Sequence, residues 1–247
     1  MNKHNYTSAY YRGQNEYGNF PWSDDINYVL WYSAGESNVR IVKKKGDNSI
    51  VLPIYPPEKA VELYEPIKEL HQSLEKYIPL LYTASLKKHE GSHAYRVIRN
   101  ALIIGNLIGL RTRQLELLAL AALYHDSGRK NDRRAVGHGK RSAILFQQTV
   151  WKYDFPMRTL SKSEVDIVKS IISLHEIEDK EAIPILKKQW NSYVKIKLFC
   201  ILKDADALDR YRFQKYRRHF DYHYLRTDEA KRLPLVTAWQ FEEDQKN

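Results

Sequence analysis

The clearest chemical signal in the sequence is an adjacent imidazole and carboxylate, His125-Asp126, which follows an apolar run. The run over residues 117–124 is typical of a buried helix, so it would deliver both side chains to the edge of a core. An imidazole nitrogen and a carboxylate oxygen can together bind one divalent metal ion. Such a dipeptide also occurs by chance, so it predicts a site only in the company of further ligands.

Two further ligands are available on other predicted helices. His93 opens the helix that precedes the His125-Asp126 pair, and Asp206 lies inside a later one. Four ligands from three helices can converge, as in the metal sites of helical bundles. Because mixed nitrogen and oxygen ligation suits several ions, the cofactor could be Mn, Fe, Mg, Ni or Zn.

Most of the chain from residue 56 onward is predicted to be helical. Apolar residues recur there at spacings of three and four, beginning with Val61. Gly109 is a plausible helix stop, and Thr112 and Thr227 are plausible caps. The predicted helices span residues 58–78, 93–108, 112–124, 139–153, 161–175, 192–208 and 228–238.

Residues 1–55 differ in composition from the helical domain predicted for residues 56–247. They are rich in aromatic residues, Asn, Ser and Gly, and residues 28–33, 39–42 and 49–52 read as short strands. Aromatic richness argues against disorder. We therefore expect a small, partly β N-terminal annex on an otherwise all-α protein.

The net charge of +10 suggests three kinds of surface. One is a generally basic surface, the second attracts an anionic phosphate substrate, and the third binds nucleic acid. The third rests on a basic, aromatic segment at residues 210–218, although aromatic residues at helical spacing are more often core.

Cysteine content and hydropathy indicate the cellular compartment of the protein. The single Cys200 cannot form an internal disulfide, and no apolar stretch is long enough to span a bilayer. We expect a cytoplasmic protein that makes no membrane contact. Signals for non-classical secretion would not be visible by these rules, and the oligomeric state is not predicted.

Taken together, His93, His125-Asp126 and Asp206 resemble the H…HD…D signature of the HD-domain phosphohydrolase superfamily. The flanking motifs HEGSHAYRV (89–97), HDSGRK (125–130), HGKRSA (138–143) and KDADALDR (203–210) strengthen the resemblance, which covers residues 86–232. Glu90 stands where this family usually has Gly. The resemblance implies an HD-domain helical bundle that hydrolyses a phosphomonoester or phosphodiester, often of a nucleotide, with metal-activated water.

The same resemblance assigns roles to individual residues. His93, His125, Asp126 and Asp206 would be metal ligands, with Asp206 favoured over Asp204. Asp126 could also accept the proton of the attacking water. The site would hold one or two ions. Two further sets of side chains would surround it, two histidines and four basic residues. His138 and His175 would bind a second ion or touch the phosphate, while Arg129, Lys130, Lys140 and Arg141 would offset phosphate charge or form solvated surface.

Two alternatives to a metal-dependent phosphohydrolase stay open. The sequence also resembles the phosphodiesterase domain of the SidE family, which works without metal through His and Glu; His89 would then be the central residue, as a substrate-side acid or base. The intact set of four ligand positions favours the metal-dependent reading. The second alternative is a non-catalytic module that binds a nucleotide or nucleic acid.

Overall fold

The computed structural model describes residues 55–82, 91–130, 136–213 and 224–246, together with the backbone of four short strands between residues 17 and 52. Contacts divide the chain into a central unit, residues 64–206, and a second unit that combines residues 1–63 and 207–247. Apart from the strands, the described elements are helices, which confirms the all-α prediction for the body. The predicted boundary between residues 55 and 56 stays a prediction.

The strands pair in one antiparallel sheet of order β1-β2-β3-β4. Their bounds are β1 Tyr17–Gly18, β2 Tyr28–Ser33, β3 Val39–Lys43 and β4 Ile50–Leu52. The last three agree with the strands expected from the sequence to within one residue. The packing of an annex against the helical body stays a prediction, and the intervening residues lie outside the described part.

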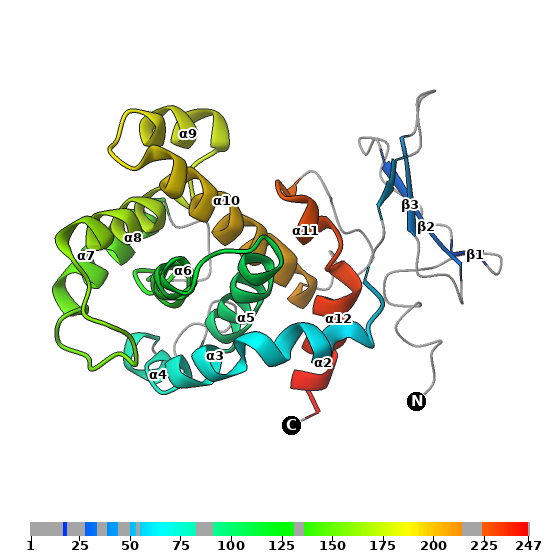
Figure 1. Cartoon of the computed structure of the whole chain (residues 1–247), viewed down its shortest axis with the longest axis horizontal. Helices are drawn as coiled ribbons and strands as arrows, with labels where there is room; N and C mark the ends of the chain where they lie inside the picture. The colour runs from blue at the N-terminus through cyan, green and yellow to red at the C-terminus, as the bar shows by residue number, and fades with distance from the viewer. Residues whose placement is uncertain are drawn as a thin grey trace. The chain divides into compact units, whose positions relative to one another are not determined.

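The central unit is built around α6, which places its buried end at the candidate site. Every residue from Leu117 to Tyr124 is nearly inaccessible to solvent. Helix α6 packs on α5 and α8, and α7 packs on α8 (Figure 1). Helix α2, Lys59–Tyr64, belongs to the second unit up to residue 63. The α-helices that begin in the central unit are α3 Lys68–Glu75, α4 Ile78–Leu81, α5 Gly91–Leu107, α6 Thr112–Tyr124, α7 His138–Thr149, α8 Lys162–Leu174, α9 Asp179–Lys187 and α10 Ser192–Leu208.

Several predicted helix ends agree with the structure for the expected reasons. Gly109 follows α5 with φ of 74°, a left-handed conformation that favours glycine. Ser161 caps α8 and forms a capping box with Glu164. The predicted helix 192–208 is α10 to the residue. No helix in the described part is long and apolar enough to cross a membrane.

Three other predictions about the helices were wrong. Val61 is 65% exposed rather than inward. Arg111, not Thr112, is the N-cap of α6, and its backbone N–H donates to the Gln114 side chain. The helix predicted over residues 139–153 ends at Thr149, and in the loop that follows the Asp154 carbonyl accepts a hydrogen bond from the Tyr77 hydroxyl.

Beyond residue 207, the described part of the second unit contains three helical elements, η2 Asp209–Arg212, α11 Asp228–Lys231 and α12 Pro234–Asp244. The helix predicted over residues 228–238 is therefore two helices, since Pro234 cannot donate a backbone hydrogen bond and begins a new one. Thr227 caps α11 as expected.

The basic, aromatic segment at residues 210–218 is partly internal to this second unit. Tyr211 is buried and donates to Glu242, and Arg212 pairs with Asp209 at 2.9 Å. Residues 214–218 lie outside the described part. The described residues thus support core packing for Tyr211, and nucleic-acid binding stays a prediction.

Candidate active site

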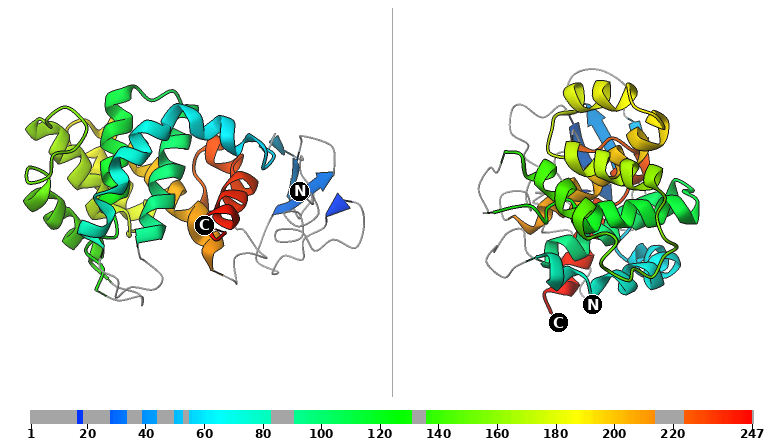
Figure 2. Two further views of the ribbon diagram at one scale, coloured as in Figure 1. Left: turned by 90° about the horizontal axis from the view of Figure 1, so that it is seen from below. Right: turned by 90° about the vertical axis from the view of Figure 1, so that its left-hand side faces the viewer.

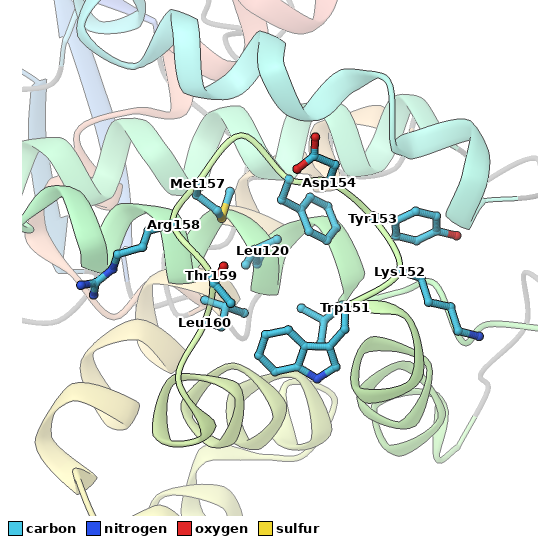
Figure 3. A pocket seen from close by; sticks show the side chains of 11 residues that line it. Leu120, Trp151, Lys152, Tyr153, Asp154, Met157, Arg158, Thr159 and Leu160 are labelled. Carbon is cyan, nitrogen blue, oxygen red and sulfur yellow. The ribbon is translucent and has the colours of Figure 1, made fainter.

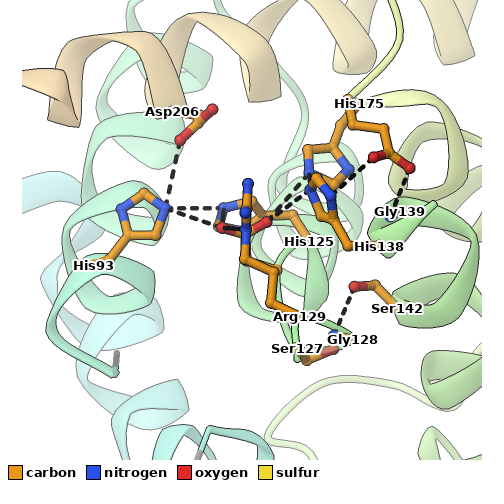
Figure 4. A network of polar contacts seen from close by, with 12 residues as sticks. His93, His125, Ser127, Gly128, Arg129, His138, Gly139, Ser142, His175 and Asp206 are labelled. Atoms are coloured by element: carbon orange, nitrogen blue, oxygen red, sulfur yellow. Dashed lines mark hydrogen bonds and ion pairs between the residues drawn. The ribbon is translucent and has the colours of Figure 1, made fainter. Parts of the chain in front are cut away.

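Five segments of the central unit converge on the candidate site (Figure 4). His93 lies in the first turn of α5, His125 and Asp126 directly follow α6, His138 opens α7, His175 follows α8, and Asp206 lies near the end of α10. We call these six side chains the His/Asp cluster. All are buried except Asp206, whose side chain is 33% exposed.

The predicted four-ligand set is brought together around one nitrogen. The Nε2 atom of His93 lies 3.2 Å from His125 Nε2, 3.6 Å from Asp126 Oδ2 and 3.4 Å from Asp206 Oδ1. Asp204, in contrast, is fully buried in the core side of α10. The geometry therefore selects Asp206 as the aspartate of α10 that joins the cluster, while its role as a metal ligand stays a prediction.

Asp126 links this group to a second one. Its Oδ1 atom lies 3.0 Å from His138 Nε2 and 3.5 Å from His175 Nε2, and these two nitrogens are 3.0 Å apart. Possible ligand atoms of His93, His125 and Asp206 form one compact group, and those of Asp126, His138 and His175 form another. Both groups fit the donor set of a divalent cation.

The hydrogen bonds at the other ring nitrogen determine how three of the imidazoles face the cluster. The Nδ1 atoms of His125 and His175 each lie 2.7 Å from a backbone carbonyl oxygen, and Nδ1 of His138 lies 2.8 Å from Glu176 Oε2. Carbonyl and carboxylate oxygens only accept, so each Nδ1 carries the proton. In the neutral ring, each Nε2 then presents a lone pair to the cluster.

Burial keeps His125 neutral near physiological pH. Loss of hydration lowers its pKa to about 3, despite the opposing attraction of Asp126. The Nε2 lone pair of His125 therefore faces His93 Nε2 at 3.2 Å and Asp126 Oδ2 at 3.8 Å. Such contacts are repulsive unless a proton or a cation lies between them.

Arg129 acts on the cluster through Asp126. Its Nε atom lies 2.8 Å from Asp126 Oδ2 in a largely buried ion pair. The positive guanidinium offsets the charge of the Asp126 carboxylate, and the Arg129 side chain is only 15% exposed. The predicted contact of Arg129 with phosphate stays a prediction.

The other predicted substrate contacts are placed less directly. Lys130 and Lys140 are exposed, whereas Arg141 donates to the Gly128 and Val136 carbonyls at 3.0 and 3.2 Å. His89 lies outside the described residues. Phosphate binding by these four side chains is therefore untested.

Two residues that the sequence did not assign to the site support it. Glu176 accepts hydrogen bonds from His138 and from the Gly137 and Gly139 amides, which fixes the start of α7. Tyr82 donates to the Leu123 carbonyl at 2.9 Å at the end of α6, and burial raises its pKa well above the usual value. Glu176 could have been suspected from the sequence only because it follows His175. No sequence signal indicates Tyr82.

A separate pocket of about 340 Å³ lies along the loop between α7 and α8 (Figure 3). Residues 150–160 and Leu120 of α6 line most of it. Arg113 holds this loop by donating to the Arg158 and Thr159 carbonyls. No residue of the His/Asp cluster lines this pocket.

The comparisons with known proteins give one match. The family model of the SidE phosphodiesterase (PDE) domain matches residues 74–238, about two thirds of the chain. No curated protein and no solved structure matches. SidE phosphodiesterase domains are HD-like helical hydrolases.

The matched segment contains every residue of the His/Asp cluster. The match agrees with the helical hydrolase that the HD resemblance implied, and it supports the SidE-like alternative better than the metal-dependent main reading. Metal dependence is not established by it. Since the match spans well over half of the sequence, this chain belongs to the SidE phosphodiesterase domain family.

Proposed function

We propose that this chain is a phosphodiesterase that cleaves its substrate at the His/Asp cluster. The observation that carries the proposal is the convergence of four imidazoles and two carboxylates from five segments of the family-matched unit. Phosphoribosyl-ubiquitin chemistry belongs to SidE phosphodiesterase domains, so a phosphoribosyl-linked diester is the first substrate to test. A nucleotide diester is the second, from the HD resemblance.

The chain's own residues can supply the proton transfers of this reaction. His138 is oriented by Glu176, so its Nε2, beside Asp126, can take up the proton of an attacking water as the new P–O bond forms and return it to the oxygen that leaves when the old P–O bond breaks. The ion pair with Arg129 offsets the negative charge of Asp126, which would reduce its repulsion of an approaching phosphate. His89 would be the central residue if catalysis runs entirely through side chains, as the SidE family match suggests.

A second reading adds a divalent cation, and the protonation pattern is compatible with it. Histidines that bind metal usually donate their other ring N–H to a carbonyl or carboxylate, as His125, His138 and His175 do. The two groups of possible ligands could hold one or two ions, and Asp126, a member of the second group, also lies 3.6 Å from His93 of the first. When bound, such a cation would offset negative charge on the phosphoryl oxygens and lower the pKa of water.

The test combines substrate class with metal removal. The purified chain is assayed on bis(p-nitrophenyl) phosphate, p-nitrophenyl phosphate and a phosphoribosyl-linked diester, before and after treatment with a chelator. Variants His89→Ala and His125→Ala are compared with His4→Ala, a histidine outside every predicted site.

Cleavage of the diesters that survives chelation and is lost in His89→Ala supports the side-chain route. Cleavage that is lost on chelation, returns with a divalent metal and is abolished in His125→Ala supports the cation route. Failure to cleave any diester, with or without added metals, would sink the proposed function.

A further inference from the structure

One turn of the central unit exposes large apolar side chains that its own fold does not use. Trp190 is 68% exposed and Tyr193 is 77% exposed, and Ile185 on the preceding helix is 45% exposed. All three lie within nine residues, across the turn that joins α9 to α10. Neither aromatic ring stacks on another ring or on a cation among the described residues. We call this surface the α9–α10 turn.

The turn is held firmly rather than left loose. Lys195, which is almost completely buried, donates to the Gln189 side chain at 2.8 Å and pairs with Asp166 of α8 at 2.5 Å. Asn191 adopts a left-handed φ of 56°, the only such non-glycine residue in the described part. A fixed backbone therefore presents Trp190 and Tyr193 outward at little further loss of conformational entropy on binding.

The charged residues nearest to these rings along the chain are all basic. From Ala182 to Leu202 the sequence has four lysines and no acidic residue. Lys195 is neutralised by Asp166, whereas Lys187 and Lys188 are exposed and form no ion pair with any described residue. The segment that carries Trp190 is therefore aromatic and basic, with two exposed lysines beside the ring in sequence.

Trp and Tyr beside Lys are the residues that settle at the boundary between lipid headgroups and acyl chains. Lysines add attraction to the negative surface of anionic bilayers. Figure 1 and the right-hand view of Figure 2 show α9 at the outer edge of the central unit, and no residue of the α9–α10 turn lines the pocket of Figure 3. A projecting edge suits a broad, flat partner better than a peptide that needs a cleft.

We propose that the α9–α10 turn is a peripheral docking site for an anionic membrane surface. Trp190 and Tyr193 would enter the headgroup region, and Lys187 and Lys188 would pair with lipid phosphates or carboxylates. This inference goes beyond the expectation of no membrane contact and is independent of the phosphodiesterase proposal, because its test reads binding and not hydrolysis.

The test is co-sedimentation of the full chain with phosphatidylcholine vesicles that contain or lack phosphatidylserine. The wild-type chain is expected to bind only the anionic vesicles. The double variant Trp190→Ala/Tyr193→Ala should bind about tenfold or more weakly, and neutralising Lys187 and Lys188 with Gln should weaken binding about fivefold for each lysine.

A matched control is Trp151→Ala, because Trp151 is also exposed, at 55%, but lies on the loop after α7. It should bind like wild type. Brominated lipid should quench tryptophan fluorescence in wild type and Trp151→Ala, and less in Trp190→Ala. Because the substituted side chains are exposed, circular dichroism should show every variant folded.

Two results would overturn the proposal. One is absence of binding of the wild-type chain to anionic vesicles. The other is equal binding of wild type and the Trp190→Ala/Tyr193→Ala variant. Crosslinking of the turn to an acidic protein, without any vesicle binding, would also overturn it in favour of a protein interface.

Discussion

Replacement of Glu176 tests whether the cluster depends on the partner that orients His138. The carboxylate accepts the His138 Nδ1–H through Oε2, and the Gly137 and Gly139 amides through Oε2 and Oε1, all within 3.0 Å. Glu176→Ala leaves three donors at the start of α7 without this acceptor. With about 1 kcal/mol for each of these hydrogen bonds, the variant should lose about 3 kcal/mol of unfolding free energy.

Activity should fall further than folding alone explains. Loss of a partner that orients a site histidine typically lowers activity or metal affinity about 10–100-fold. Glu176→Gln should lie between wild type and Ala, because its amide oxygen can replace Oε2 but its NH2 group would face the Gly139 N–H. Urea denaturation and diesterase kinetics, both at a pH where each variant is folded, give the two quantities.

The control is Glu178→Ala, two residues away. Its side chain is 71% exposed and pairs with Lys180 on the surface, so its removal should change stability by less than about 0.5 kcal/mol. If Glu176→Ala proves no more destabilising than Glu178→Ala and retains its kcat/KM, Glu176 does not position His138 and the reasoning fails.

Two further perturbations probe the segment that follows α6. With metal removed, unfolding free energy should fall by about 1.4 kcal/mol per pH unit below about pH 6.5 on account of His125, because the unfolded state binds a proton there that the folded state, with a pKa of about 3, excludes. Urea midpoints for His125→Asn should show a flatter dependence over this range, and parallel curves would contradict the assignment. Gly128→Ala should lose about 1–3 kcal/mol by overpacking, since its Cβ would lie 2.4 Å from the Ser142 backbone nitrogen. An Ala variant as stable as wild type in urea would show that α7 yields without strain.

The course of the helices could be predicted where local chemistry fixes it. The apolar run before His125 and the polar, glycine-containing turn after Asp126 place the end of α6 without any tertiary information. The mainly apolar run of residues 192–202 likewise indicates α10.

Predictions failed where distant contacts decide the backbone. The loop after α7 is hydrogen-bonded to Tyr77, a residue of the segment between α3 and α4, and no pattern near Thr149 reveals this contact. Helix α9 was missed because Pro184 interrupts a short amphipathic stretch. Val61 follows the helical period but is exposed, since periodicity gives a face without saying that another element covers it.

In the His/Asp cluster, too, the residue types could be read from the sequence, but the hydrogen-bond partners that orient them could not. The sequence indicated which histidines and aspartates could meet, but Glu176 and the Ala122 and Ile172 carbonyls determine what they offer when they do. Because these acceptors hold the Nδ1 protons, the Nε2 atoms of His125, His138 and His175 face the cluster. A site of inward lone pairs around Asp126 favours a positive species at its centre, either a proton or a cation. Side-chain catalysis and cation-assisted catalysis therefore need the same scaffold, and metal content with chelator sensitivity, rather than further geometry, separates them.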